Sequence, residues 1–404
     1  MFYQKTLHNG LTLIGESREG ALSTALGFFV KTGARDETPE IAGVSHFLEH
    51  MMFKGTKKRS ALELTYDLGA IGAQANAFTS EENTVYYMTI LPEYFEKGMD
   101  IICDIMRSTF VQEEFDMEKK VILEEIALYQ DKPHFVLYEN AVRKFFADHP
   151  GGNSVLGTNK SISEVTREQM LKYFTERYSP SNMVFAVSGA FDWEQFSALA
   201  ENYCGAWENY PASRDTRAHI PVKSSGSITK KDLQLPYVCF MASGPSMQND
   251  LRYSMHLLVM ILGDATGSKV YWELVDKGLA DGVTMSMSEM DGTGFILAYA
   301  GTEDKNLDKV SDILRNIMLS AKDFTDEDLE RAKTKYKTRL VLHGENSMSR
   351  LVTVGMEWVY NKKYQTIEEE LEIINRITKR DILDSLKEFS LEPMTEMRLI
   401  ACPI

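Results

Sequence analysis

His46-Phe47-Leu48-Glu49-His50, set in an apolar stretch that starts at Ala42, is the segment that most restricts the fold and chemistry of this chain. On a helix, residues four apart share one face, so both imidazoles can reach one metal ion while Glu49 lies beside it. A single histidine on an apolar helix is more often a packed core residue than a ligand. With only 8 histidines in 404 residues, however, this order of His and Glu rarely arises by chance. The pentapeptide therefore predicts a metal site of the kind that holds zinc.

A catalytic zinc ion takes three protein ligands and keeps a fourth position open, so a further ligand is needed. The best candidate segment is the helix predicted around residues 115–126, where two carboxylates fall on an otherwise apolar stripe. The members of this stripe are Glu118, Val121, Ile122, Glu125, Leu128 and Tyr129. Buried carboxylates require a partner or a metal, whereas Glu124 shares a face with charged residues and is expected to be solvated. We therefore predict Glu125 as the third ligand and Glu118 as an auxiliary carboxylate.

Glu49 is the residue left for acid–base chemistry. In this role it takes a proton from zinc-bound water, whose pKa zinc can lower to about 7, and passes it to a leaving amine. The metal polarises the attacked carbonyl, so the expected reaction is hydrolysis of a peptide bond without a covalent intermediate. The alternative for Glu49 alone is an ordinary exposed carboxylate on a helix.

Length and composition describe a globular protein of more than one domain: 404 residues, of which 44% are hydrophobic and 25% charged. The first residues lack the regions of a signal peptide and no segment has 18 uncharged apolar residues, which predicts a cytoplasmic protein without a membrane span. Four cysteines without a CxxC pair are expected to be buried apolar residues. They are Cys103, Cys204, Cys239 and Cys402.

The net charge of −15 bears on the partners of the protein. Nucleic acids and anionic membrane surfaces are disfavoured because the average field of the chain repels them. The same field favours cationic peptides. The alternative is that the acidity only keeps the protein soluble.

Strands and helices alternate along the chain in a pattern typical of an α+β protein. Strands are predicted at 11–16, 23–32, 76–91, 182–188 and 237–242, and helices at 60–69, 93–109, 112–131, 136–147, 251–262, 326–341 and 367–389. The polar segment 213–226 has no amphipathic period and is the best candidate linker. It separates an N-terminal domain, 1–212, from a C-terminal domain, 227–404. The second half repeats the outline of the first without the His-Glu pentapeptide, which suggests a duplicated fold with metal only in the first copy.

Several segments resemble the pitrilysin/insulinase family of inverted zinc peptidases, and in particular its short bacterial and mitochondrial-processing-peptidase branch. The matching residues run from Ala42 to Thr56, from Asn76 to Ser80, from Thr84 to Tyr87 and from Val121 to Ile126. Glu125 also lies 75 residues after His50, which is the separation of the third ligand in that family. The resemblance covers the first half well and the second half in outline.

The resemblance implies a zinc metalloendopeptidase built as a clamshell, with one zinc per chain on the N-terminal domain and peptides or unfolded polypeptides enclosed between two homologous α+β domains. It also implies that Asn76, Ala77 and Phe78 form an edge strand to which the substrate backbone adds by β-pairing. The alternative for Asn76 is an ordinary interior strand.

One departure from the family is expected to matter. Its C-terminal half carries an Arg and, seven residues later, a Tyr that bind substrate and stabilise the oxyanion; the comparable positions here are Leu274 and Asp281. Either Tyr271 or Lys269 substitutes, or a partner subunit supplies the pair, so a homodimer or heterodimer is expected. The competing functions are a non-hydrolytic or partner-dependent subunit of a peptidase-like complex, and a zinc hydrolase acting on a non-peptide amide.

Overall fold

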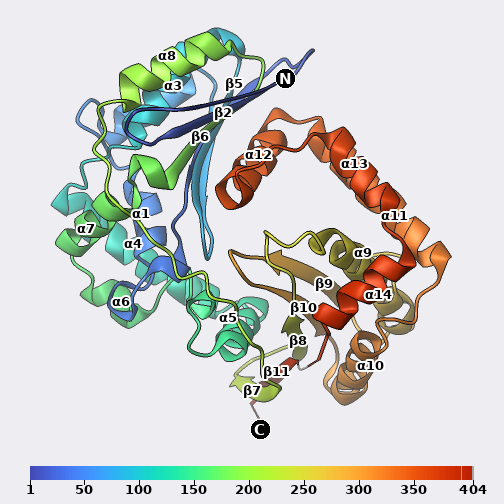
Figure 1. Ribbon diagram of the computed structural model, residues 1–404. Helices are drawn as coiled ribbons and strands as arrows, with labels where there is room; N and C mark the ends of the chain where they lie inside the picture. The colour runs from blue at the N-terminus through green and yellow to red at the C-terminus, as the bar shows by residue number, and fades with distance from the viewer. Residues whose placement is uncertain (393, 403–404) are drawn as a thin grey trace. The chain divides into compact units, whose positions relative to one another are not determined.

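Two compact α+β units form the chain, as a computed structural model that describes residues 1–392 and 394–402 shows (Figure 1). Unit 1 comprises Met1–Ile126, Asn153–Asp215 and Leu342–Gln365, and unit 2 comprises Ala127–Gly152, Thr216–Val341 and Thr366–Ile404. The α+β class with a sheet and packed helices in each unit is confirmed. No helix in the described ranges is long and apolar enough to cross a membrane.

Unit 1 is built on a six-stranded sheet with the order β1-β2-β6-β3-β5-β4. Its strands are β1 (Phe2–Thr6), β2 (Thr12–Ser17), β3 (Thr24–Val30), β4 (Gln74–Thr79), β5 (Thr84–Ile90) and β6 (Met183–Gly189). Its helices are α1 (Val44–Met51), α2 (Ala61–Ala70), α3 (Phe95–Ile105), α4 (Gln112–Gln130), α6 (Asn159–Glu164), α7 (Arg167–Arg177), α8 (Trp193–Cys204) and α12 (Ser347–Asn361). All neighbours are antiparallel except β2 and β6.

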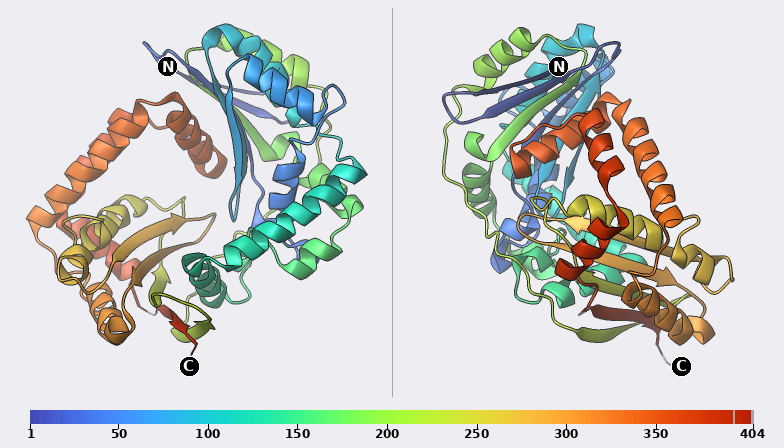
Figure 2. Two further views of the ribbon diagram at one scale, coloured as in Figure 1. Left: turned by 180° about the vertical axis from the view of Figure 1, so that it is seen from behind. Right: turned by 45° about the vertical axis from the view of Figure 1, so that its right-hand side comes forward.

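Both faces of the unit 1 sheet are covered, which explains why β3 is buried at every position. The alternation of a strand sends Phe28 to one face, where its ring stacks on Phe185, and Phe29 to the other. Helices α3 and α8 cover the first face, and α12 covers the second, where Leu351 and Val354 pack into the core with Phe29. In Figure 2 the orange-red α12 lies beside the strands of this sheet.

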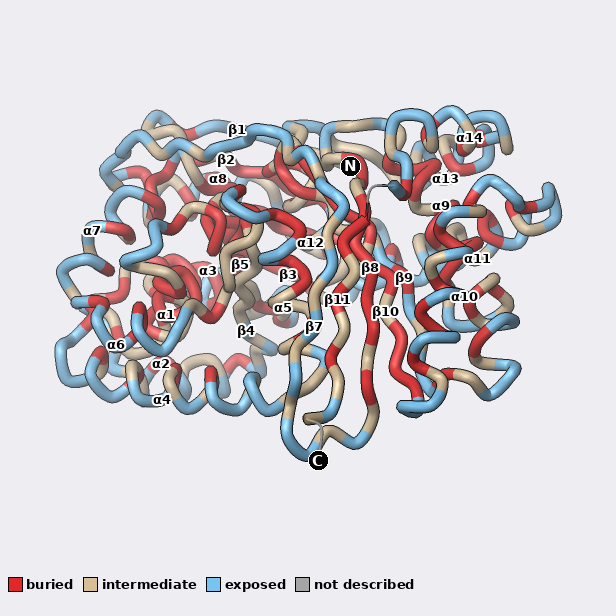
Figure 3. Tube along the Cα trace, turned by 90° about the horizontal axis from the view of Figure 1, so that it is seen from below, coloured by how far each residue is buried: buried red, intermediate tan, exposed pale blue. Residues whose placement is uncertain are grey.

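Unit 2 repeats this plan with a five-stranded sheet of order β7-β11-β8-β10-β9. The strands are β7 (Ser224–Lys230), β8 (Tyr237–Ser243), β9 (Gly282–Glu289), β10 (Gly294–Gly301) and β11 (Thr395–Ala401). The helices are α5 (Pro133–Phe146), α9 (Arg252–Gly263), α10 (Leu307–Leu319), α11 (Asp326–Gly344), α13 (Ile367–Arg376) and α14 (Lys379–Glu388). In Figure 3 the central β8 is buried along its length, whereas β1 at the edge of the unit 1 sheet is largely exposed.

The two sheets share one topology, which supports the predicted duplication. Leaving aside β1, the strand orders correspond one to one, and in both sheets the outer pair, β2–β6 or β7–β11, is parallel. Helix α9 follows β8 as α1 follows β3. The helix that occupies the place of α1 in unit 2 thus carries Tyr253 and His256 but no His-Glu pentapeptide.

Each unit contains one helix from the other half of the sequence. The compact units therefore differ from a contiguous division of the chain at 213–226. Helix α5 lies before the predicted linker yet packs on β8 and β11 of unit 2, with Leu137 and Phe146 in the core of that unit. Helix α12 lies after the linker yet packs on β3 and β6 of unit 1. An apolar helix stripe shows that a helix is buried but not which sheet it covers, so the exchange is invisible in the sequence.

The predicted elements are otherwise present, with these differences. Ten helices and strands had no predicted bounds, and they are β1, β7, β9, β10, β11, α6, α7, α8, α10 and α12. The single helix expected at 367–389 is two helices. Thr378 separates them because its side chain accepts a hydrogen bond from the amide of Asp381 at 3.3 Å, a capping box that starts α14. Cys103, Cys204 and Cys239 are buried, as predicted, and Cys402 is partly exposed.

Candidate metal centre

Helix α1, which carries the pentapeptide, forms because its apolar residues fall on one face. Val44, Phe47, Leu48 and Met51 follow the spacing of a helix and are fully buried. The helix starts at Gly43, whose φ of +90° is the left-handed conformation that glycine adopts without strain. A Cβ there would also meet the carbonyl oxygen of Leu156 at 2.6 Å.

Glu37 fixes the first turn of this helix. Its carboxylate accepts hydrogen bonds from the amides of Gly43 at 2.6 Å and Ser45 at 2.7 Å, two of the groups that a helix start leaves unpaired. Burial raises the pKa of Glu37 to about 8, although the hydrogen bonds from the two amides act in the opposite direction and lower it. The helix that carries the pentapeptide is therefore anchored from outside its own residues.

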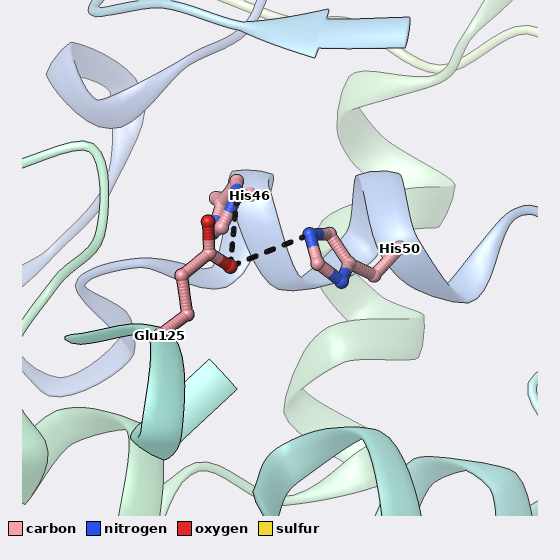
Figure 4. A group of neighbouring side chains, drawn as sticks. All are labelled: His46, His50 and Glu125. Atoms are coloured by element: carbon pink, nitrogen blue, oxygen red, sulfur yellow. Dashed lines mark ion pairs between the residues drawn. The ribbon is translucent and has the colours of Figure 1, made fainter. Parts of the chain in front are cut away.

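His46, His50 and Glu125 come together as predicted. The Nε2 atom of His46 lies 3.8 Å from Oε2 of Glu125, and the Nε2 atom of His50 lies 3.7 Å from the same oxygen. One ligand atom from each residue lies within 4.8 Å of the other two. Figure 4 shows the carboxylate of Glu125, from α4, pointing toward both imidazoles of α1.

This arrangement fits zinc in donor type and spacing. Two imidazole nitrogens and a carboxylate oxygen are the ligand set of many catalytic zinc sites, and ligands about 2.0–2.2 Å from a tetrahedral ion lie roughly 3.4 Å apart. The two separations from Glu125 need to close by only a few tenths of an ångström, and the separation between the two imidazole nitrogens is at most 4.8 Å. The three residues leave the fourth position to water or substrate.

Glu118 holds one of the two histidines in the required orientation. Its Oε1 lies 2.8 Å from Nδ1 of His50, and its Oε2 lies 2.5 Å from the ammonium nitrogen of Lys54. A proton on Nδ1 leaves the lone pair of Nε2 on the side of Glu125. The Glu118 side chain is only 4% exposed, and although burial raises its pKa, His50 and Lys54 together keep it below the usual value. The structure thus places this residue beside a ligand.

The other histidine is held by its surroundings in the neutral form that binds metal. Burial, with a smaller contribution from the charge of His50, lowers the pKa of His46 to about 4. Its Nδ1 is buried and has no hydrogen-bond partner among the described residues.

Glu49 lies on the same helix but points to the end of β4. Its Oε2 accepts a hydrogen bond of 2.5 Å from the hydroxyl of Thr79. Burial raises the pKa of Glu49, while the Thr79 hydrogen bond and the charge of His50 oppose that rise. A carboxylate with a raised pKa is a stronger base than a fully solvated glutamate.

The strand β4 is an edge strand, so the interior alternative for Asn76 is excluded. Among the described strands β4 pairs only with β5, through Asn76 opposite Tyr87, Ala77 opposite Tyr86 and Phe78 opposite Val85. Its other edge pairs with no described strand, and the amide of Ala77 donates to Oδ1 of Asn76 at 2.8 Å. Helix α1 packs directly against it.

The stripe predicted on α4 is only partly correct. Glu118 and Ile122 are buried and Glu124 is exposed as expected, but Val121 and Leu128 are 42% and 58% exposed. The buried face of α4 is rotated toward Phe115, Glu118, Ile122 and Ile126. Glu125 consequently lies at the margin of that face with its side chain 25% exposed, where a metal and solvent can both reach it.

The positions that replace the expected Arg and Tyr lie in unit 2. Leu274 is fully buried in the core of that unit, and Asp281 is an exposed residue directly before β9. Tyr271 is half-buried at the start of a π-helical turn, Tyr271–Val275, and the ammonium group of Lys269 donates to the carbonyl oxygen of Asp323. Substitution by either residue stays a prediction.

Sequence patterns indicated no role for Glu37 or Lys54 and placed Thr79 only within the matching segment from Asn76 to Ser80, although all three contact the site directly or fix its helix. Each lies close in the chain to a predicted segment, but its contact appears only in the structure. Glu37 binds the start of α1, Lys54 pairs with Glu118 of α4, and Thr79 of β4 hydrogen-bonds Glu49 of α1. Thr79 offered the best signal, because it ends the Asn76-Ala77-Phe78 strand with a hydroxyl.

Comparisons with known proteins identify the family of this chain. A model described as insulinase (peptidase family M16) matches residues 13–159, and one described as peptidase M16 inactive domain matches residues 164–336. A Rickettsia bellii protein named as an uncharacterized zinc protease is 33% identical over 390 residues, covering 95% of this chain and 94% of its own length. The chain belongs to the insulinase family, M16.

Further proteins are similar to this chain over nearly its whole length. The Bacillus subtilis protein YmxG, also named as an uncharacterized zinc protease, is 30% identical over 93% of both chains. The crystal structure of a protease from Helicobacter pylori covers 99% of both chains with a TM-score of 0.90 at 21% identity. A Pseudomonas fluorescens structure described as a peptidase M16 inactive domain gives a TM-score of 0.90 at 17% identity. These structures share the fold of this chain.

Proposed function

We propose that this protein is a zinc-dependent endopeptidase that binds one zinc ion through His46, His50 and Glu125. The observation that carries the proposal is the approach of these three ligand atoms to within 4.8 Å of one another, on two helices that are each anchored by buried contacts. The zinc proteases among its relatives support the same activity. The alternative substrate is a non-peptide amide. The peptide assay below distinguishes the two substrate classes.

Different residues of the chain perform different parts of the proposed hydrolysis. A bound zinc ion supplies a Lewis acid that polarises the scissile carbonyl and makes water acidic. Glu49 accepts the proton of the attacking water and delivers it to the leaving amine. Glu118, held by Lys54, keeps His50 turned so that its Nε2 faces the metal position.

The edge strand β4 is the proposed docking site for the substrate backbone. A peptide that adds to β4 at Asn76–Phe78 pairs with main-chain groups whatever its sequence, which suits an enzyme acting on short or unfolded polypeptides. Helix α1 packs against β4, so a peptide paired there lies close to the metal site. Enclosure of that peptide by unit 2 stays a prediction from the family resemblance.

A second function is favoured by one observation. Leu274 and Asp281 stand where the family resemblance places Arg and Tyr, and removal of an oxyanion donor typically costs a factor of about 10²–10³ in turnover. A chain that binds zinc but obtains the Arg and Tyr from a related subunit, in a homodimer or heterodimer, would account for the absence of these two residues here.

The deciding experiment measures zinc content and hydrolysis of a mixed fluorogenic peptide library on one purified sample. We expect about one zinc per chain, turnover in the wild type, and retained zinc with lost turnover in Glu49→Gln. His50→Ala and Glu125→Gln should lose the metal. The assignment is wrong if Glu49→Gln loses zinc and Glu125→Gln does not. Stoichiometric zinc without cleavage would favour the partner-dependent function.

A further inference from the structure

Thr79 is the single described side chain that hydrogen-bonds Glu49. Its hydroxyl donates to Oε2 at 2.5 Å, and Oε1 has no hydrogen-bond partner among the residues that the structure describes. Thr79 is the last residue of β4, directly after the strand segment Asn76–Phe78. It belongs neither to the metal ligands nor to the proposed backbone docking site.

This contact fixes how the carboxylate of Glu49 is turned. A glutamate side chain has three rotatable bonds, so without a partner its two oxygens exchange places freely. A hydroxyl that occupies Oε2 leaves Oε1 free to accept the proton of the attacking water. The donor itself is half-buried and sits on a strand, so it moves little.

Contacts at the end of β4 and in the turn to β5 support the position of Thr79. Thr79 pairs with Thr84 across the turn that joins β4 to β5, and the amide of Ser80 donates to the carbonyl of Asn83 at 2.8 Å. The Nη1 atom of Arg35 lies 2.5 Å from Oε1 of Glu82 in that turn, and both side chains are at most 3% exposed. The hydroxyl is therefore presented from a rigid turn.

We propose that Thr79 is a positioning residue for catalysis, which holds the general base Glu49 by one oxygen and leaves the other for the proton transfer. The inference rests on the proposed function, because it assumes that Glu49 is the base. It predicts that removal of the hydroxyl slows the chemical step without affecting metal binding or peptide affinity.

The test compares Thr79→Val with Thr79→Ser. Valine keeps the shape and β-propensity of threonine but has no hydroxyl, whereas serine keeps the donor. Residues that orient a catalytic group typically contribute a factor of about 10–100, so we expect Thr79→Val to lower kcat by about that factor with KM and zinc content unchanged. Thr79→Ser should restore most of the wild-type kcat. Glu49→Gln, measured beside them, should be inactive.

The outcomes separate the inference from the function it rests on. A Thr79→Val enzyme with wild-type kcat beside an inactive Glu49→Gln overturns the role of Thr79 and leaves the peptidase standing. The role is also excluded if Thr79→Ser is as slow as Thr79→Val, or if Thr79→Val loses its zinc or raises KM alone. Full activity in Glu49→Gln, or no hydrolysis by the wild type, removes both conclusions together.

Discussion

Arg350 of α12 and Glu16 of β2 form a buried ion pair between residues 334 positions apart in the sequence. The Nε of Arg350 donates to Oε2 of Glu16 at 2.8 Å, and its Nη2 donates to Oε1 at 2.5 Å. The hydroxyl of Tyr364 donates to the same Oε1 at 2.8 Å. This bidentate contact holds a helix from the second half of the sequence against the sheet that supports the candidate metal site.

Removing the arginine should weaken unit 1 strongly. Arg350→Met leaves Glu16 charged and buried, and loss of one partner of such a pair typically costs about 3–5 kcal/mol. Chemical unfolding followed by hydrogen exchange of β2 and β3 measures the change. Arg380→Met, at an arginine that is 90% exposed, is the control and should change little. Equal stability of the two variants would contradict the assigned role.

The same pair predicts a dependence of stability on pH. Burial alone raises the pKa of Glu16, but the hydrogen bonds and charge of Arg350 outweigh it and hold the pKa below its usual value. The stabilisation is therefore present in full above the ordinary glutamate pKa, and is lost as the pH falls through the lowered folded value. Melting temperatures of wild type and Glu16→Gln should differ most near neutral pH and converge in acid. A difference that grows in acid would refute this account.

The close approach of α12 to the sheet predicts an effect at Gly355. A Cβ at this position would fall on the ring of Phe29, so Gly355→Ala should destabilise unit 1 by about 1–3 kcal/mol through overpacking. Gly69→Ala is the matched control, because Gly69 is also helical and nothing lies within 4 Å of its Cβ position. That variant should be neutral or slightly more stable, since alanine favours helix. Differential scanning calorimetry of both variants tests the contrast.

Glu118→Gln tests the carboxylate behind His50. The amide cannot accept from the imidazole and the ammonium of Lys54 as the carboxylate does, so His50 is less well oriented and zinc affinity should fall by about 10–100-fold. Competition with a chelator measures the affinity. Glu124→Gln, an exposed neighbour on α4, should bind zinc like the wild type. Unchanged affinity in Glu118→Gln would show that the ion pair is structural only.

Tyr360 of α12 holds the β4–β5 turn. Its hydroxyl donates to Oε2 of Glu82 at 2.7 Å and accepts from Nδ2 of Asn83 at 2.6 Å. Tyr360→Phe removes both hydrogen bonds, so it should cost about 1–3 kcal/mol and loosen the turn. Faster hydrogen exchange of the amides of residues 79–84, with zinc content unchanged, is the expected result. Protection equal to the wild type would argue against this anchoring.

Local pattern in the sequence was enough for about half of the elements and for the candidate metal ligands. The pentapeptide places His46 and His50 on one helix face because helix geometry is the same everywhere, and the buried carboxylates of α4 are visible as charges in an apolar stripe. Helix and strand positions follow from periodicity for the same reason. The pattern was less reliable for the rotation of α4, since Val121 and Leu128 are apolar but exposed.

The sequence by itself determined that this chain is α+β, that its two halves are related and that His46, His50 and Glu125 can meet. Only the tertiary structure decided which sheet α5 and α12 cover, that Thr79 hydrogen-bonds Glu49, and that Arg350 pairs with Glu16. The physical reason is that periodicity records whether a residue is buried, while the identity of its neighbour depends on packing between segments hundreds of residues apart.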